Sequence, residues 1–276
     1  MTINLNGKLM DLSTPKVMGI LNITPDSFYD GGVFSSEKKI LDQVEKMLRE
    51  GADIIDIGGY SSKPGAKKVK IDEELIRVIP AIELIKNEFN NIVISIDTFR
   101  SEVAYKAVQS GASLVNDISA GELDSKMLKC VAELKVPYIL MHMQGNPQNM
   151  QKNPTYKNVI KDIITSLSKK IFLAKKSGII DIIVDPGFGF GKTIKHNYQI
   201  LNDLSFFKEL GCPILVGLSR KSMIYKQLDI KIEDALNGTT CLNTVSILNG
   251  AKILRVHDVK EAKQVIELTN FLNKNN

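Results

Sequence analysis

Short apolar runs alternate with amphipathic stretches along the whole chain. Each run is rich in Val, Ile and Leu and ends in a polar or glycine-rich segment, which is typical of a strand in a parallel sheet covered on both faces. The runs lie at residues 17–21, 53–57, 92–96, 113–115, 138–141, 182–184, 214–216 and 251–254. The pattern therefore predicts eight short strands.

The stretches between these runs have helical spacing. Ile40, Val44 and Met47 recur at about 3.6-residue intervals ahead of Gly51, a residue typical of a helix end. No Pro-, Ser- or Gly-rich break divides the chain, and no dinucleotide-binding fingerprint follows the first strand. We therefore predict one α/β domain over residues 1–276, a (β/α)8 TIM barrel, with residues 1–15 as a short N-terminal cap. The same spacing predicts further helices over residues 75–85, 103–108, 123–134, 159–174, 200–210, 235–248 and 259–272.

Composition agrees with this fold and narrows the function. The 276 residues suit a barrel, which needs about 250. The net charge of +5 comes from scattered lysines, which argues against a nucleic-acid partner. Three cysteines without C-x-x-C spacing argue against a disulfide framework and a thiolate zinc site. The polar N-terminus and the lack of an apolar run of about 18 residues predict a soluble, cytoplasmic protein with no signal peptide and no membrane partner.

Polar residues follow the predicted strands. In a (β/α)8 barrel the active site forms where the strands end. A lone Asp, Asn or Ser at such a place is commonly a cap or turn former, which is a sufficient interpretation of Asp117 and Ser219, and His142 has a packing interpretation. Helix capping does not explain why Lys221, Arg255 and His257 all follow predicted strands at the same end of the barrel, however. The set comprises Asn22, Asp97, Asn116, Asp117, His142, Asp185, Gly217, Ser219, Arg220, Lys221, Arg255 and His257, with the glycine-rich loop 58–66 after the second strand.

The chemistry of this set indicates a ligand class. Asp97, Asp185 and Asn116 match the several donors and acceptors of a planar heterocycle. Arg255, His257 and Lys63 offer positive charge for phosphates. Asn22 offers an amide oxygen to Mg²⁺, which usually keeps waters and bridges substrate phosphates. Together these residues predict a site for a heteroaromatic diphosphate with Mg²⁺ as cofactor.

The segment GFGFGKT at residues 187–193 is similar to a phosphate-binding P-loop. Its spacing is one residue short, and Pro186 stands where the first glycine belongs. Residues 194–197 are also a poor helix start. We therefore predict a loop whose glycines approach the ligand closely, with Phe190 as an aromatic wall, and no nucleotide site.

Seven blocks, read together, resemble the dihydropteroate synthase family. They lie at residues 18–28, 95–98, 116–118, 140–147, 185–192, 217–222 and 255–258, in the order and spacing of that family. The resemblance implies a homodimeric barrel that joins 6-hydroxymethyl-7,8-dihydropterin pyrophosphate to para-aminobenzoate and releases pyrophosphate, and that is a target of sulfonamides. It also implies early loss of the diphosphate, followed by attack of the aniline nitrogen.

The resemblance also implies roles for single residues. The pterin is expected to contact Asp97, Asn116, Met143, Asp185, Gly217 and Lys221. The pyrophosphate is expected to contact Asn22, Ser62, Lys63, Arg255 and His257, with Asn22 also the Mg²⁺ ligand. The para-aminobenzoate pocket is expected to comprise Phe28, Pro64, Phe190, Lys221 and Ser222. The residues expected to act in catalysis are Asp97, Ser62, Lys63, Lys221, Arg255 and His257.

The loop after the second strand departs from the family's usual Gly-Glu-Ser-Thr-Arg-Pro-Gly. Tyr60 replaces the carboxylate, and Lys63 keeps the positive charge but lacks the planar fork of arginine. The departure bears on the affinity for the amine and for sulfonamides.

Three alternatives stay open from the sequence. A pterin-binding methyltransferase shares the pterin slot, but it needs neither segment 24–28 nor the pair Arg255 and His257, and a corrinoid D-x-H-x-x-G motif is absent. An aldolase-like barrel would use Lys221 as a Schiff-base nucleophile, which borohydride trapping would reveal. A non-catalytic pterin-binding paralogue, for which Tyr60 and Lys63 leave room, would bind pterin without turnover.

Overall fold

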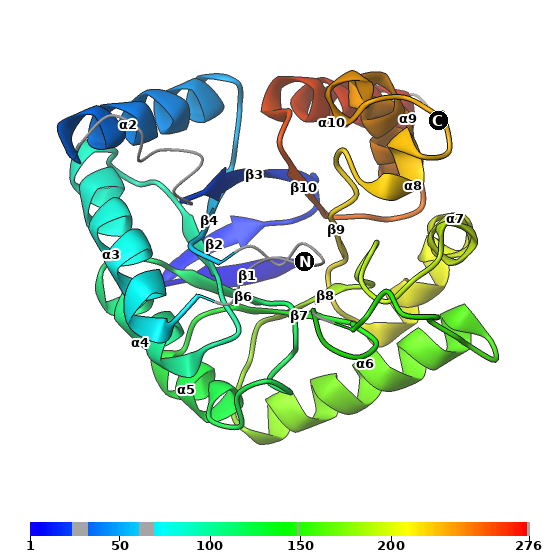
Figure 1. The fold of residues 1–276 in the computed structure, drawn as a ribbon, viewed down its shortest axis with the longest axis horizontal. Coiled ribbons are helices and arrows are strands. Elements are labelled where there is room, and N and C mark those ends of the chain that lie inside the picture. Colours follow the sequence, from blue (N-terminus) through cyan, green and yellow to red (C-terminus); the bar gives the residue numbers. More distant parts are fainter. Residues whose placement is uncertain (24–32, 61–68, 148, 275–276) are drawn as a thin grey trace.

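The computed structural model describes residues 1–23, 33–60, 69–147 and 149–274. Eight parallel strands form one sheet in the order β8-β7-β6-β5-β4-β3-β10-β9. A parallel bridge between Val184 and Ile214 joins the two ends of this order, so the sheet closes into a barrel (Figure 1). The predicted fold class is confirmed. The strands are β3 (Lys16–Asn22), β4 (Ile54–Gly58), β5 (Ile94–Asp97), β6 (Leu114–Asp117), β7 (Tyr138–Met141), β8 (Ile182–Asp185), β9 (Leu215–Val216) and β10 (Ile253–Val256).

Helices surround the barrel because each strand is followed by an amphipathic segment (Figure 1). Their apolar faces pack on outward-pointing strand residues such as Val17, Ile55 and Ile96 in the main core. None of the helices that the structure describes is both long and apolar enough to cross a membrane. The helical segments are α2 (Val33–Arg49), α3 (Ile71–Glu88), α4 (Ser101–Gln109), α5 (Met127–Leu134), α6 (Val159–Lys176), α7 (Ile194–Asn202), η1 (Leu204–Leu210), α8 (Ser222–Tyr225), η2 (Ile232–Asp234), α9 (Leu236–Leu248) and α10 (Val259–Lys274).

The prediction at α7 is wrong. Residues 194–197 were expected to be a poor helix start, yet α7 begins at Ile194 with Thr193 as its N-cap. The backbone N–H of His196 donates to Thr193 Oγ1 over 3.1 Å, and the Thr193 N–H donates to His196 Nδ1 over 3.3 Å. A histidine therefore takes the place that Glu or Gln usually has in a capping box.

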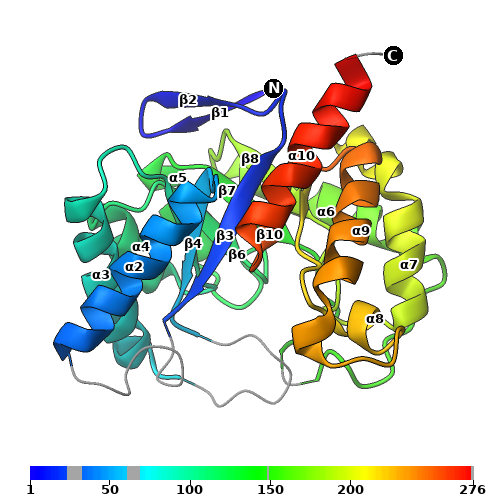
Figure 2. The same ribbon diagram turned by 90° about the horizontal axis from the view of Figure 1, so that it is seen from above.

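A β-hairpin closes the N-terminal end of the barrel (Figure 2). Its strands are β1 (Thr2–Leu5) and β2 (Lys8–Asp11), and they pair antiparallel. Ile3, Leu5 and Leu12 are buried in a second core, together with interior barrel residues such as Met18 and Ile54. This end of the barrel is therefore filled with apolar side chains. The polar residues at the strand ends lie at the opposite end.

Strand alternation sets which side chains enter the barrel. On β4, Ile55 and Ile57 pack outward in the main core, whereas Ile54 points into the interior. Asp56 and Gly58 follow Ile54 at a spacing of two and therefore also point inward. Six of the eight strands end one or two residues later than predicted, whereas β7 and β9 end as predicted, so that Asn22, Asp97, Asn116, Asp185 and Arg255 are strand residues. Their positions are consequently set by the barrel itself.

Candidate active site

A guanidinium held between two carboxylates lies at the C-terminal end of the barrel. Arg255 on β10 donates from Nε to Asp56 Oδ2 over 2.6 Å and from Nη2 to Asp97 Oδ2 over 2.7 Å. Burial raises the pKa of Asp97 to about 7, the charge of Asp56 adds to the rise, and Arg255 opposes it. The pKa of Arg255 is raised because the two carboxylates outweigh its burial. Arg255 therefore stays cationic, while Asp97 titrates near neutral pH.

Asp56 was missing from the predicted site. Its side chain is fully buried, and Oδ2 also accepts a hydrogen bond from Asn116 Nδ2 over 3.1 Å. Among the described residues Oδ1 has no hydrogen-bond partner. The signal in the sequence was a carboxylate within the apolar run 53–57. Charged residues are almost never fully buried unless paired, so that position called for a partner.

Asp185 and Lys221 form the opposite part of the site. Asp185 at the end of β8 is buried and accepts a hydrogen bond from the Gly187 N–H over 2.7 Å. Its pKa is raised by burial, against the positive charges of Lys221, Lys192 and Arg255. Lys221 Nζ donates to the Phe188 carbonyl over 2.6 Å. Burial lowers the pKa of Lys221 to about 8, against the charge of Asp185.

Apolar side chains lie beside these polar groups. The predicted pterin contact Met143 is buried in a small cluster at the site end of the barrel. Phe190 is partly buried against this cluster, and Lys221 Nζ lies 4.6 Å from the centroid of its ring. The arrangement combines a flat apolar wall with hydrogen-bonding groups, as planar ligands require. The other members of the cluster are Ile118, Met141, Met150 and the partly buried Phe99.

Two glycines leave room between the polar side chains. A Cβ atom on Gly58 would lie 3.7 Å from both Asn22 Oδ1 and Asp97 Oδ2, and one on Gly217 would lie 3.7 Å from Arg255 Cβ. These are ordinary contact distances, so the backbone does not require glycine here. The missing side chains leave space next to Arg255 and Asp97 instead.

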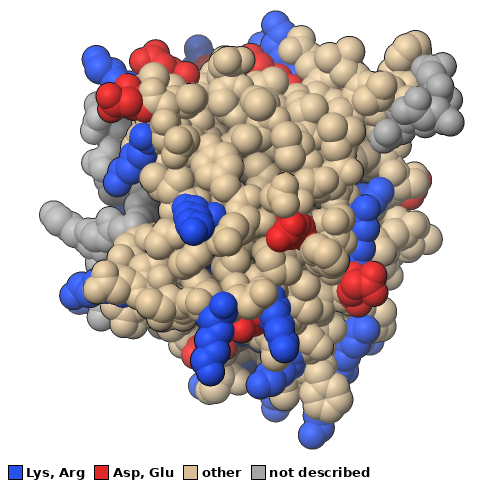
Figure 3. Space-filling view, turned by 90° about the vertical axis from the view of Figure 1, so that its right-hand side faces the viewer, with Lys and Arg blue, Asp and Glu red and all other residues tan. Residues whose placement is uncertain are grey.

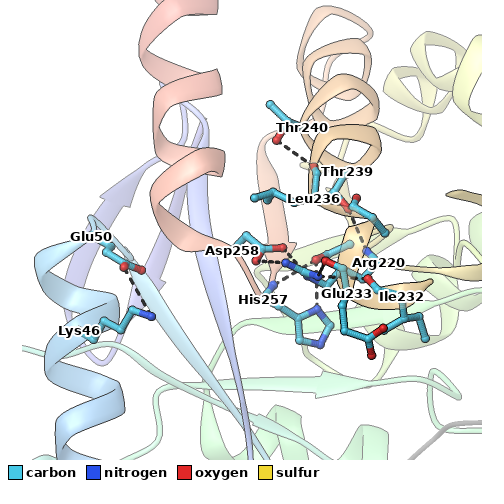
Figure 4. A network of polar contacts seen from close by, with 12 residues as sticks. Lys46, Glu50, Arg220, Ile232, Glu233, Leu236, Thr239, Thr240, His257 and Asp258 are labelled. Atoms are coloured by element: carbon cyan, nitrogen blue, oxygen red, sulfur yellow. Dashed lines mark hydrogen bonds and ion pairs between the residues drawn. The ribbon is translucent and has the colours of Figure 1, made fainter. Parts of the chain in front are cut away.

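His257 belongs to a network that fixes the loops after β9 and β10 (Figure 4). Ser219 Oγ lies 3.1 Å from His257 Nδ1 and accepts from the His257 backbone N–H over 3.2 Å. Arg220 has a left-handed backbone with φ 53° and binds Asp258 through two hydrogen bonds of 2.9 and 2.8 Å. It also donates to the carbonyls of Ile232 and Glu233. Ser219 therefore orients the histidine and is not only a cap.

The segment that is similar to a P-loop contains a buried lysine. Lys192 Nζ lies 3.1 Å from His142 Nδ1 and donates to the carbonyls of His142 and Phe190 over 3.2 and 2.9 Å. The ammonium is thus used within the protein and is not available to a nucleotide phosphate. His142 is buried with its pKa lowered to about 2, by burial and then by the charges of Lys192 and Lys170, which agrees with its packing interpretation.

Asp117 is a turn former, as the sequence analysis allowed. Its Oδ1 accepts from the Ser119 N–H, and its Oδ2 accepts from the Gly121 N–H and from Tyr138 Oη. Both carboxylate oxygens are therefore used within the protein, in the turn after β6 and by Tyr138 on β7.

The structure brings most of the predicted site residues to one end of the barrel. Asp97, Asn116 and Arg255 are joined by hydrogen bonds through Asp56 and Arg255. The charges of Lys221 and Arg255 act on Asp185. Asn22 lies at the end of β3, and Ser222 is the first residue of α8. Four predicted residues lie outside the described part of the chain, namely Phe28, Ser62, Lys63 and Pro64.

Mg²⁺ has one candidate protein ligand here. Within residues 1–23, 33–60, 69–147 and 149–274, no group of three His, Cys, Asp or Glu side chains is placed to hold a metal ion. Asn22 is exposed at the barrel mouth, with its Oδ1 near Gly58. A single amide oxygen fits Mg²⁺, which keeps several waters and takes its further ligands from substrate phosphates.

The comparisons with known proteins agree on one family. Residues 18–257 match the family described as "Pterin binding enzyme". The dihydropteroate synthase of Haemophilus influenzae is 46% identical over 265 residues, which cover 95% of this chain and 96% of that protein. The chain belongs to the dihydropteroate synthase family.

Solved structures of this family superimpose closely on the chain. The dihydropteroate synthase of Yersinia pestis, determined with a sulfonamide drug, has a TM-score of 0.93 and 39% identity and covers 99% of this chain and 100% of its own. The Xanthomonas albilineans dihydropteroate synthase, determined with 7,8-dihydropteroate, has a TM-score of 0.88 and 36% identity, with 99% of each chain covered. The family resemblance and the transferase class expected from the sequence are confirmed.

Proposed function

We propose that this chain condenses 6-hydroxymethyl-7,8-dihydropterin pyrophosphate with para-aminobenzoate to give 7,8-dihydropteroate and pyrophosphate. The observation that carries the proposal is a set of polar groups at the ends of β5, β6 and β8, beside the Arg255 guanidinium. Asn116 and Asp185 are buried, and Asp97 is partly buried. The set supplies hydrogen-bonding groups for a heterocycle and a cation for a diphosphate at the same end of the barrel.

The pterin ring is recognised by the carboxylates of Asp185 and Asp97 and the amide of Asn116. A carboxylate accepts N–H donors, and an amide both donates and accepts, which suits the mixed edge of a pterin. Met143 covers a face of the ring, and Lys221 donates to a ring acceptor after giving up the Phe188 carbonyl. Gly217 leaves the space that the ring needs beside Arg255.

The diphosphate is bound by Arg255 and His257, with Asn22 as the protein ligand of Mg²⁺. Mg²⁺, when bound, supplies charge stabilisation for the phosphate oxygens. Arg255 faces two carboxylates, so part of its charge is already balanced. Ser219 holds the ring of His257 for this contact. Ser62 and Lys63 extend the proposed diphosphate site, and Ser62, Lys63, Arg255, His257, Asp97 and Lys221 are the residues assigned to catalysis.

The amine binds next to Phe190, Lys221 and Ser222, with Phe28 and Pro64 as further pocket residues. Phe190 offers its ring to the aromatic amine. The bond between the methylene carbon and the diphosphate oxygen breaks first, and the electron-rich dihydropterin ring spreads the charge. The aniline nitrogen then forms the C–N bond and loses its proton, so the chain supplies orientation and electrostatics and no strong base.

We also assign the chain to homodimers in the cytoplasm. A broad area with few charged side chains covers much of the face on the side of α7 (Figure 3). Phe206 on η1 is 58% exposed and Leu248 on α9 is 52% exposed. The end of α9 lies beside α7 and η1, because Asn249 Nδ2 donates to the Leu201 carbonyl of α7 and a Cβ on Gly250 would meet the Lys208 side chain of η1. Patches of this kind favour association. The cysteines are free thiols, as in a reducing compartment.

The dimer is tested by light scattering during gel filtration. The unchanged chain is expected at twice the mass of one chain, and Phe206→Glu is expected to dissociate it. Leu268→Glu is the control, because Leu268 is 73% exposed on α10, and it is expected to leave the mass unchanged. A monomeric unchanged chain contradicts the assignment.

The reaction is tested by measuring pyrophosphate release with Mg²⁺ and the dihydropterin pyrophosphate, with and without para-aminobenzoate. Release that equals dihydropteroate formation supports the function and shows that Tyr60 and Lys63 are compatible with turnover. Tight pterin binding without product would instead identify a non-catalytic paralogue. Arg255→Ala is expected to weaken binding of the pyrophosphate ester more than binding of the bare pterin.

A further inference from the structure

Lys192 has no part in the reaction described above, although its side chain is as buried as the site residues. It is 3% exposed and lies at the end of the loop that follows β8. Its three polar neighbours are His142 Nδ1, the His142 carbonyl and the Phe190 carbonyl, at 3.1, 3.2 and 2.9 Å from Nζ. The lysine thus joins the end of β7 to the loop after β8.

The three neighbours match the three N–H bonds of an ammonium group. A neutral amine would turn a lone pair towards one of these acceptors. Burial lowers the pKa of Lys192, and the charge of Asp185 opposes that shift. Burial also lowers the pKa of His142, and Nδ1 of the neutral ring accepts from Lys192 in the tautomer that carries its proton on Nε2. The geometry therefore places three polar neighbours around Nζ, which hold the side chain in one position between the two segments.

The loop that Lys192 ties down is packed too closely to move alone. A Cβ on Gly187 would lie 2.0 Å from the His142 carbonyl oxygen, and one on Gly191 would lie 2.7 Å from the Gln144 carbonyl oxygen. Tyr156 Oη donates to the Gly191 carbonyl over 2.8 Å. The backbone of residues 187–191 thus lies directly on the chain that leaves β7, and the Lys192 side chain links the two through its contacts with His142 and Phe190.

The same loop holds the ammonium of Lys221. The Phe188 carbonyl accepts from Lys221 Nζ over 2.6 Å, and the Phe190 ring lies 4.6 Å from it. The Phe190 carbonyl therefore accepts a hydrogen bond from Lys192, and the Phe190 ring contacts Lys221. We propose that Lys192 is a positioning residue that sets the Phe190 ring and the Phe188 carbonyl around Lys221, and thereby shapes the site of the aromatic amine. The identity of the amine as para-aminobenzoate rests on the proposed function. The contacts of Lys192 with Phe190, and of Phe190 with Lys221, do not depend on it.

A double-mutant cycle tests the inference. Lys192→Met keeps the length of the side chain and removes the three donors, and it is expected to raise the KM for para-aminobenzoate about tenfold, as for the loss of a hydrogen bond to a charged group. Phe190→Ala is expected to raise the same KM. If Lys192 acts through Phe190, the double variant raises KM no more than the larger single change. Multiplied effects, or an unchanged KM in Lys192→Met, overturn the proposal.

Controls separate this role from a loss of folding. Lys195→Met removes an exposed lysine on the first turn of α7 and is expected to leave the KM unchanged. If Lys192→Met does not fold, Lys192→Gln replaces it, because the amide keeps two N–H donors without the charge. If Lys192 only stabilised the fold, Lys192→Met would lower the thermal unfolding midpoint, but the effects of Lys192→Met and Phe190→Ala on KM would multiply.

A second measurement does not need turnover. In the ligand-free protein, the rate at which an amine-reactive acetylating reagent modifies Lys221 is followed by peptide mass spectrometry. Lys192→Met is expected to raise that rate several-fold relative to the other lysines, because Lys221 is released from the loop. An unchanged rate overturns the proposal. If the protein without any substitution forms no dihydropteroate, the proposed function is refuted. The acetylation measurement still decides the role of Lys192 in that case, because it needs no turnover.

Discussion

Nε of Arg255 lies 2.6 Å from Oδ2 of Asp56, a fully buried carboxylate in the middle of β4. The two residues are 199 positions apart in the chain. Asp97 binds the same guanidinium from β5. The cation that we propose for binding the diphosphate is therefore held in place by the barrel before any ligand arrives, which is the preorganisation that electrostatic catalysis requires.

Asp56→Asn is expected to destabilise the protein by about 2 to 3 kcal/mol, because one charge of a buried pair is left with a weaker partner. It is also expected to raise the KM for the dihydropterin pyrophosphate, since Arg255 loses its fixed orientation. Urea unfolding and steady-state kinetics measure the two effects. Asp72→Asn, on the exposed first turn of α3, is the control and is expected to change stability by less than about 0.5 kcal/mol. Equal results for both variants contradict the assigned role of Asp56.

Pterin binding is expected to strengthen as pH rises through about 7. Burial raises the pKa of Asp97 to about 7, and only the ionised carboxylate accepts two N–H donors. Below that pH each unit weakens binding by up to about tenfold, and above it the affinity levels off. Titration of the bare dihydropterin at several pH values measures this. Asp97→Asn is expected to remove the step near pH 7, and a step that persists in this variant assigns it to another group.

Asp185→Ala is expected to weaken pterin binding at least about a hundredfold, because the ring loses a charged acceptor in a buried site. Asp181→Ala is the matched control, because Asp181 directly precedes the same strand at its other end and accepts from the Asn4 N–H. Calorimetric titration of both variants with dihydropterin compares them. Unchanged pterin affinity in Asp185→Ala would falsify the recognition role.

Gly187→Ala is expected to cost at least about 3 kcal/mol of stability. Its backbone has φ +75°, and a Cβ would lie 2.0 Å from the His142 carbonyl oxygen, so both strain and overlap arise. Gly211 has φ +66° with no atom within 4 Å of a Cβ, so Gly211→Ala is expected to cost only about 1 kcal/mol. Thermal unfolding of both variants measures the difference, and similar midpoints would show that the loop after β8 adapts.

Local patterns were sufficient to predict the barrel and the end that carries the site. The apolar runs and the helical spacing are properties of neighbouring residues, so they are legible without the fold. The rule that parallel strands end on one rim then placed Asp97, Asn116, Asp185 and Arg255 together. The start of α7 was missed because His196 completes the capping box in place of the expected Glu or Gln.

The sequence by itself determined which residues alternate along each strand and therefore which side chains enter the barrel. The tertiary structure alone decided their partners. Asp56 meets Arg255 because β3 pairs with both β4 and β10, and Lys192 meets His142 because β7 pairs with β8, so residues that are 199 and 50 positions apart come into contact. Burial then makes those contacts obligatory, since a charge removed from water is stable only when paired and hydrogen-bonded. No local pattern contains that information, because both distance and burial arise from the packed barrel.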